Sequence, residues 1–427
     1  SITSIGENAF YYCSSLTSII IPKSVRSIGD YAFGWCESLT SIIIPESVTR
    51  IGEYAFYCSS LTSITISEGV TNIGNYAFYY CENLTSVTIP ESVTSIGDAI
   101  FAECDNLTSI EVNEKNQKYI SDNGVLYTKD KTKLIQYPAG KQENKYVILE
   151  GVTSIGSSTF EGCSSLTSIT IPEGVTSIGE RVFYNCSSLT SITIPESVTS
   201  IGYRAFSDCS SLISLAIPEG VTSIGDWAFS GCSSLISLAI PESVTSIGEY
   251  AFYYCKSLKS ITIPEGVTSI EYNTFSHCSN LTIYCTSNSY AKEYAEKENI
   301  KYITDDDAPT IESVTGNAIQ WTKENVTLTV KATDSMSGLA SQAYSFDNGK
   351  TWQKENTKTY TGNTNGVIIK VRDAVGNIAT YQTINVNKID KQAPTISGVT
   401  GNATQWTKGN VTLTVKATDS MSGLASQ

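Results

Sequence analysis

The sequence predicts a mainly β protein in two parts, a solenoid of about 12 coils with a 23-residue repeat followed by β-sandwich modules. Cysteines recur in register, first at 13, 36, 58, 81 and 104 and then at 163, 186, 209, 232, 255 and 278. Apolar residues recur in the same register, which is interrupted between Cys104 and Cys163. After an acidic run at 305–307, a second and longer repeat begins. Fixed periods of this kind indicate stacked units, because one unit alone cannot bury its apolar face.

Each 23-residue unit predicts two extended stretches and one tight turn. In the unit at 166–186, three apolar residues occupy the inward positions of a short strand. Pro172 ends this strand, because proline has no N–H to donate to a neighbouring strand. After a second extended stretch, Phe183 and Cys186 fit a single helical or 3₁₀ turn that points both side chains inward. The strand-surface positions of the units are interpreted as Thr and Ser throughout.

The repeated string is Leu-x-x-Ile-x-Ile-Pro, then Val-x-x-Ile-Gly-x-x-Ala-Phe-x-x-Cys. It resembles the BspA-like, or Treponema-type, leucine-rich repeat, and about eleven copies match within residues 1–304. The resemblance implies a right-handed leucine-rich-repeat solenoid with parallel strands on one face. It also implies an extracellular or cell-surface location, with host extracellular-matrix or partner-cell proteins as ligands. Both ends of the sequence fall midway through a repeat, so we expect it to be part of a longer chain.

Two segments interrupt the repeat within residues 1–304. Residues 113–142 contain turn signals between apolar runs, such as Asp122-Asn123-Gly124, and therefore predict a β-hairpin island. Residues 289–303 predict a C-terminal cap, a helix followed by a last strand. Ser289 suits the N-cap of this helix. The expected apolar stripe of the helix comprises Tyr290, Ala291, Tyr294 and Ala295.

The second part contains its own, longer repeat. The segment Ala308-Pro309-Thr310-Ile311 recurs at 393–396, and residues 326–342 recur unchanged at 411–427. Alternating apolar residues in this part favour half-buried strands of a β-sandwich. The pattern resembles bacterial immunoglobulin-like modules that form stalks on surface proteins. We expect one module at 305–391 and a truncated second module at 392–427.

Charge and composition exclude several classes of function. The net charge of −14 lies in residues 1–304, and an acidic surface disfavours nucleic acid and anionic lipid as partners. No apolar run is long enough for a membrane helix, so no membrane insertion is expected. The chain has one histidine, His277, and no Cys-x-x-Cys pair. We therefore expect no catalytic residue, no metal centre and no cofactor.

The cysteines in register are interpreted as buried free thiols that behave as small apolar side chains. Stacked coils bring neighbouring cysteines close together, but their Cβ bonds point the same way, which is poor disulfide geometry.

Two patterns in the second part have a structural and a functional interpretation. Residues 345–352 match the Asp-box of sialidases, but a single copy favours a hairpin in which Asp347 binds backbone amides and Trp352 packs beneath. The acidic run at 305–307 can bind calcium together with Asp373 or Asp390. A solvated acidic linker is the favoured interpretation.

The positions that vary most between units are the two residues before Ala-Phe and the two after it. Aromatic residues concentrate there and avoid the core positions, so we expect partly exposed rings along one edge of the solenoid. Such rings are favoured at protein interfaces and on glycan platforms, although simple coil-to-coil packing is an equal alternative. The candidate ligand-binding residues form a first group and a smaller second group, separated by plainer coils and the island: Tyr31, Trp35, Tyr54, Tyr57, Tyr76, Tyr79 and Tyr80, then Trp227, Tyr250, Tyr253 and Tyr254.

The functional hypothesis is a cell-surface or secreted binding and adhesion protein without enzymatic activity. Its solenoid is expected to recognise host matrix or partner-cell proteins, with glycans as a further ligand class. Two alternatives remain, a carbohydrate-binding region of a larger secreted enzyme and a purely structural surface spacer.

Overall fold

The computed structural model describes residues 2–405 and 408–424 of the chain. The chain forms two compact units, residues 1–305 and residues 306–427.

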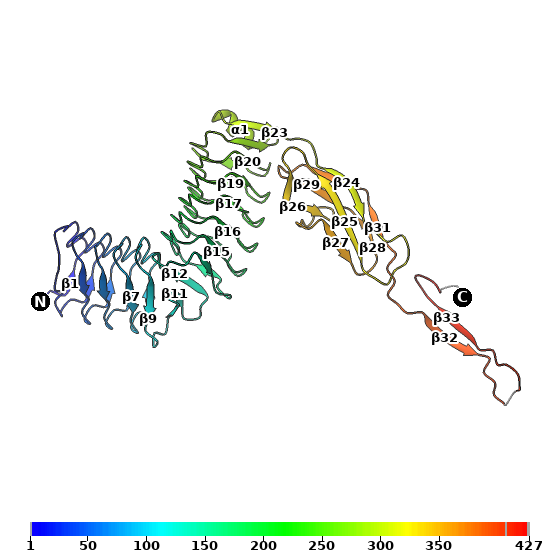
Figure 1. The fold of residues 1–427 in the computed structure, drawn as a ribbon, viewed down its shortest axis with the longest axis horizontal. Coiled ribbons are helices and arrows are strands. Elements are labelled where there is room, and N and C mark those ends of the chain that lie inside the picture. Colours follow the sequence, from blue (N-terminus) through cyan, green and yellow to red (C-terminus); the bar gives the residue numbers. More distant parts are fainter. Residues whose placement is uncertain (1, 406–407, 425–427) are drawn as a thin grey trace. The chain divides into compact units, whose positions relative to one another are not determined.

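The first unit is a β-solenoid of about 13 turns with a repeat of about 23 residues, against the 12 coils expected. The predicted fold class is therefore confirmed. Most strands lie in two sets of parallel ladders (Figure 1). The ladders of the Leu-x-x-Ile-x-Ile segment comprise β3 (Ser41–Ile43), β5 (Ser63–Thr65), β7 (Ser86–Ile89), β9 (Ser109–Val112), β13 (Lys145–Val147), β15 (Ser168–Thr170), β16 (Ser191–Thr193), β18 (Ser237–Ala239), β20 (Ser260–Thr262), β22 (Thr282–Cys285) and β23 (Lys301–Thr304).

The second extended stretch of each coil gives shorter strands. These are β1 (Ser4–Ile5), β2 (Ser27–Ile28), β4 (Arg50–Ile51), β6 (Asn72–Ile73), β8 (Ser95–Ile96), β14 (Ser154–Ile155), β17 (Ser223–Ile224), β19 (Ser246–Ile247) and β21 (Ser269–Ile270). Strands of successive coils pair one repeat apart, as Ser168 with Ser191 between β15 and β16. This register places every repeat position in a column that runs along the solenoid.

A column of phenylalanines forms the centre of the core. Phe183 is fully buried, and its ring stacks on Phe160 at 5.3 Å and on Phe206 at 5.1 Å between centroids. The thiols beside this column fill space in the apolar core and also donate hydrogen bonds. Cys209 Sγ, for example, donates a hydrogen bond of 3.1 Å to the carbonyl oxygen of Phe183 in the preceding coil.

The expectation that all register cysteines are buried is wrong at two positions. Cys13 is exposed and Cys58 is half-buried, whereas the other ten cysteines are buried. The coil of Cys58 is one residue short, so Cys58 lies one position before the thiol column. Ser59 takes its place in the core, where Ser59 Oγ lies 3.3 Å from Cys81 Sγ.

Exposed threonines connect successive coils through their hydroxyl groups. Thr94 Oγ1 donates to the carbonyl oxygen of Thr71, and Thr71 Oγ1 donates to that of Thr49, at 3.2 and 3.1 Å. The same bond recurs between coils of the second half of the solenoid, as from Thr268 to Thr245 at 3.3 Å. The recurrence of Thr at these surface positions therefore has a structural cause.

Within residues 113–142 the chain forms β10 (Tyr119–Asp122), β11 (Val125–Thr128) and β12 (Lys133–Gln136) (Figure 1). These strands pair antiparallel, and β12 also pairs in parallel with β14, so the end of this segment belongs to the solenoid. Two hydrophobic clusters meet here, one on each side of the segment. We call residues 1–112 the first stack and residues 143–305 the second stack.

The second stack ends in helix α1 (Tyr290–Lys297) and β23. Ser289 is the N-cap, and its Oγ accepts the N–H of Lys292 at 3.4 Å. Ala291, Tyr294 and Ala295 are buried against the last coil. Tyr290, expected in the same apolar stripe, is 41% exposed instead, because it lies at the first position of a helix of only eight residues.

Residues 306–427 form antiparallel sheets compatible with immunoglobulin-like modules. Their strands are β24 (Thr310–Thr315), β25 (Val326–Thr333), β26 (Leu339–Ser345), β27 (Thr357–Tyr360), β28 (Thr364–Val367), β29 (Lys370–Asp373), β30 (Ile378–Thr380), β31 (Ile384–Val386), β32 (Thr395–Thr400) and β33 (Thr414–Thr418). The core of the first module includes Val326, Leu328 and Val330 from alternate positions of β25.

Candidate functional site

The candidate aromatic residues lie in three columns on the turn side of the coils. The first column precedes Ala-Phe, the second follows Phe, and the third precedes the thiol column. Every candidate ring is half-buried or exposed, and none is buried in the core. The columns contain Tyr31, Tyr54, Tyr76, Trp227 and Tyr250 in the first, Tyr57, Tyr79 and Tyr253 in the second, and Trp35, Tyr80 and Tyr254 in the third.

The first and third columns impose an unusual backbone conformation on these rings. Tyr31 and Trp35 have φ angles of 53° and 58°, in the left-handed region. Other coils place Gly231 or Asn185 at such positions, with φ of 73° and 57°. Left-handed conformation costs a residue with a Cβ about 1–2 kcal/mol. Bulky rings at these positions therefore run against local backbone preference, and their own contacts must offset the cost.

In the first stack the rings pack from coil to coil. Tyr54 lies between Tyr31 and Tyr76, with centroid distances of 4.8 and 4.7 Å and nearly parallel planes. This spacing matches the separation of hydrogen-bonded strands. Trp35 meets Tyr57 edge to face at 5.4 Å. Burial raises the pKa of Tyr57 to about 12, so its hydroxyl remains a hydrogen-bond donor at neutral pH.

The second stack carries a similar arrangement. Trp227 stacks on Tyr250 at 4.3 Å, and Tyr250 meets Tyr253 edge to face at 5.5 Å. The group continues to His277, whose ring lies 5.2 Å from Tyr253 and 5.3 Å from Tyr254. His277 is exposed, as expected from the sequence.

Plainer coils lie between the two aromatic groups, as expected, and polar residues on these coils bridge the groups. Tyr79 donates a hydrogen bond of 3.0 Å to Glu161 Oε1, and Arg181 lies 3.8 Å from the same oxygen. The guanidinium groups of Arg181 and Arg204 both lie over the ring of Tyr184, at 5.4 and 5.9 Å. Arg204 also lies 5.2 Å over Trp227, which completes the path to the second group. We call the two groups and this bridge the aromatic face.

The bridge passes through a direct contact between the two stacks, which we call the junction. It brings Glu103 and Asp105 of the first stack against Gly162 and Asn185 of the second. Asn185 Nδ2 donates to Glu103 Oε1 at 3.4 Å. A Cβ on Gly162 would lie only 3.2 Å from Glu103 Oε2. No sequence pattern indicated the junction, because its two sides are several repeats apart along the chain.

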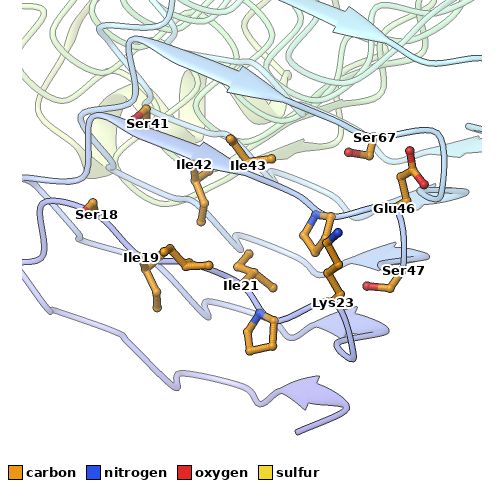
Figure 2. A pocket seen from close by; sticks show the side chains of 13 residues that line it. Ser18, Ile19, Ile21, Lys23, Ser41, Ile42, Ile43, Glu46, Ser47 and Ser67 are labelled. Carbon is orange, nitrogen blue, oxygen red and sulfur yellow. The ribbon is translucent and has the colours of Figure 1, made fainter. Parts of the chain in front are cut away.

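The strand side of the first stack carries a groove of about 800 Å³ that the sequence analysis missed. Ile20 and Ile43, 92% and 71% exposed, occupy the surface position that Thr65 holds in the next coil. Figure 2 shows isoleucines of two successive coils around the hollow, with Lys23 and Glu46 toward one end. The interpretation of the strand surface as Thr and Ser throughout is therefore wrong here. The Ile-Ile-Ile runs at 19–21 and 42–44 were the available signal.

The Asp-box segment forms a hairpin rather than a blade element. Asp347 Oδ1 accepts the N–H of Thr351 at 2.9 Å, and Arg372 lies 4.5 Å over the ring of Trp352. The bonds from Thr351 lower the pKa of Asp347 to about 2. The segment thus has a structural role in the first immunoglobulin-like module.

Asp373 and Asp390, two of the candidate calcium ligands, accept hydrogen bonds from backbone N–H groups. Asp373 Oδ1 accepts the backbone N–H groups of Val375, Gly376 and Asn377, at 3.0, 2.8 and 2.8 Å. Asp390 accepts those of Gln392 and Ser422, each at 3.0 Å. Asp373 thus holds its own turn, whereas Asp390 also connects to the segment around Ser422.

Comparison with known proteins identifies the repeats. The family model for the BspA type leucine rich repeat region matches residues 3–128 and 153–282, in six copies. A search of curated proteins finds no match. In the described part of the chain, no helix has the length and apolarity that crossing a bilayer requires.

Solved structures of bacterial proteins are similar to the chain. A leucine rich cell surface protein from Faecalibacterium prausnitzii is 39% identical, with a TM-score of 0.57, and the match covers 64% of this chain and 70% of that one. The pneumococcal vaccine antigen PcpA is 27% identical, with a TM-score of 0.60 over 72% and 78%. A leucine-rich repeat protein from Eubacterium ventriosum is 30% identical, with a TM-score of 0.52 over 60% and 81%.

Proposed function

Because the chain belongs to the BspA-type leucine-rich repeat family, we propose that it is a binding protein of the bacterial cell surface. It recognises a protein ligand, a host matrix or partner-cell protein, through the aromatic face. One similar protein is described as a cell surface protein and another as a vaccine antigen, which supports an extracellular location. The proposal assigns the chain no catalytic residue and no cofactor.

The continuity of the aromatic face carries the proposal. Tyrosine and tryptophan dominate the energetics of protein interfaces, because they offer large, rigid contact areas with polar tips. Here eleven such residues are half-buried or exposed and lie in three columns. A packing role alone does not require them, since other coils fold with Gly231 or Asn185 at equivalent positions.

The stacking geometry favours a protein over a glycan. Sugars bind aromatic platforms through a free ring face, but Tyr54 is covered on both faces by Tyr31 and Tyr76. Trp227 is covered in the same way by Arg204 and Tyr250. Ring edges and hydroxyl groups are what these residues offer a ligand, and such a surface suits the mixed apolar and hydrogen-bonding character of a protein interface.

The test is binding of the purified chain to immobilised collagen, laminin and fibronectin, and in parallel to a glycan array. Replacing Trp35 or Tyr57 by Ala should weaken binding to the matrix protein by on the order of 2 kcal/mol each. Each substitution should also lower the free energy of unfolding by about 0.5–1.5 kcal/mol, because the two rings are in contact. Trp321→Ala is the matched control, an exposed tryptophan of the second unit, and should leave binding unchanged.

The alternatives give different results in the same assays. A carbohydrate-binding region would bind the array but none of the matrix proteins. A structural spacer would bind neither, while Trp35→Ala and Tyr57→Ala still lowered stability. Unchanged matrix-protein binding by both variants would contradict binding through the aromatic face and would favour the groove at Ile20 and Ile43.

A further inference from the structure

Carboxylates gather at the junction with too little positive charge to balance them. Glu161 is fully buried and Glu103 is 7% exposed, and the neighbouring Gly162 lies close to both Glu103 and Asp105. The nearest cation is Arg181, 3.8 Å from Glu161 Oε1. The two glutamates thus share one guanidinium group, and they have little access to water.

The backbone of the segment between the stacks also approaches the first stack closely beside these groups. A Cβ on Gly140 would lie 2.6 Å from the carbonyl carbon of Asn106 and 2.7 Å from the carbonyl oxygen of Asp105. The Gly140 N–H donates to the carbonyl oxygen of Leu107 at 2.9 Å. No larger residue fits at position 140 without moving the coil that carries Glu103.

The hydrogen bonding of this cluster is incomplete. Glu161 Oε2 and Arg181 Nε are buried without a hydrogen bond of normal geometry, although the hydroxyl of Ser158 is close enough to lower the pKa of Glu161. A buried charge without full compensation is costly. Arg181 alone leaves the cluster short of positive charge, and its two glutamates have little exposed surface at which a hydrated cation could bind. A proton is the cation that fits.

We propose that Glu103 carries a proton in the closed junction and that this proton fixes the contact between the two stacks. With Glu103 neutral, Glu161 keeps its bonds to Tyr79 and Arg181, and the coils remain in contact. With both carboxylates ionised, their repulsion acts across the junction and loosens it. This proton-dependent contact does not rest on the proposed function, although it lies beside the bridge of the aromatic face.

Burial and the neighbouring carboxylates both favour the protonated form of Glu103. Burial raises the pKa of Glu103 to about 7, with further contributions from Glu161 and Asp105, while Asn185 and Arg181 oppose the rise. Burial also raises the pKa of Glu161, and Glu180 adds to the rise. The titratable and polar groups that face the two glutamates are Tyr76, Tyr79, Tyr80, Asp105, Ser158, Cys163, Glu180, Arg181, Tyr184 and Asn185.

The sign of the pH effect follows from this shift. Because the folded pKa of Glu103 exceeds its ordinary value of 4.5, the folded junction holds more protons than the unfolded chain between these two values. Its contribution to stability is therefore complete below about pH 4.5 and is lost as the pH rises through about 7. The junction should be tight in mild acid and loose in mild alkali.

Hydrogen exchange measured by mass spectrometry on the full chain tests the proposal without any ligand. Peptides spanning residues 99–106 and 158–163 should exchange several-fold faster at about pH 8.5 than at about pH 6, after correction for the chemical exchange rate. Peptides from the centre of the second stack, such as 206–212, should show no such difference and serve as the internal reference.

Two variants make the result specific. Glu103→Gln keeps the acceptor for Asn185 and should remove the pH dependence, with slow exchange at both pH values. Glu173→Gln removes the same charge from an exposed loop and should leave the dependence intact. Persistence of the full pH dependence in Glu103→Gln, or its absence in the unmodified protein, would overturn the proposal.

A third variant covers the case in which Glu103→Gln folds poorly. Asp105→Asn removes a like charge near Glu103 while leaving the carboxylate itself in place. The midpoint of the exchange transition should move to lower pH, because ionised Glu103 is then less disfavoured. An unchanged midpoint, or a shift to higher pH, would contradict the assignment of the proton to Glu103.

Discussion

The phenylalanine column offers the sharpest test of the solenoid register. Phe183 is fully buried and stacks between Phe160 and Phe206. Replacing it by Ala removes the ring from both contacts and leaves a cavity, because the neighbouring coils are fixed by their strand pairing. Substitutions of this kind cost about 3–5 kcal/mol. The bond from Cys209 should survive, since it ends on the backbone carbonyl of residue 183.

The loss should spread along the second stack, because each coil of a repeat array is stabilised by its neighbours. Urea unfolding followed by circular dichroism gives the free-energy change, and hydrogen exchange locates it in the coils of Phe160 and Phe206. Phe10→Ala is the comparison. Phe10 is half-buried and stacks on one ring only, Phe33, at 5.2 Å, so its removal should cost clearly less. A loss below about 1 kcal/mol for Phe183→Ala would refute the register.

Two further predictions concern thiols and acid stability. Alkylation of the native protein, followed by mass spectrometry, should modify Cys13 first and Cys58 more slowly. The reason is that Cys58 is half-buried and that burial raises its pKa to about 11. Rapid modification of several buried thiols would contradict the packing. The pKa of Asp347, lowered to about 2 by its bonds from Thr351, means that these bonds stabilise the first immunoglobulin-like module above about pH 4 and are lost as the pH falls toward 2. Melting of this module, followed by Trp352 fluorescence, should therefore become easier between about pH 4 and pH 2, and Asp347→Asn should flatten this dependence.

The repeat pattern predicted the solenoid because each position faces the same neighbours in every coil. Phe183 and Cys186 could be assigned to the core from their spacing alone, and both are buried. The same argument fails where a coil changes length. Cysteine identity suggested that Cys58 belongs to the thiol column, whereas the missing residue moves Ser59 into that position.

The repeat pattern could not predict contacts between coils that are far apart in the sequence. A 23-residue period describes neighbouring coils, and it places Tyr79 and Glu161 far apart in an uninterrupted solenoid. They meet at 3.0 Å because the segment between the stacks does not supply the usual turn, and Gly140 allows the adjacent coils to approach. The aromatic residues themselves were predictable. The connection of the two aromatic groups into one face was not predictable, because it depends on the contacts of Glu161 and Arg181.

The fixed spacing of the columns has a consequence for how such a protein can change. Residues 211–218 and 234–241 are identical in sequence, so recombination between their coding segments would add or delete one whole coil. Each neighbouring coil would regain the same strand pairing and the same phenylalanine contact. The aromatic face would then lengthen or shorten by one ring spacing, which is 4.7–4.8 Å in the first stack. The length of the aromatic face can thus change in discrete steps while the packing of the core stays the same.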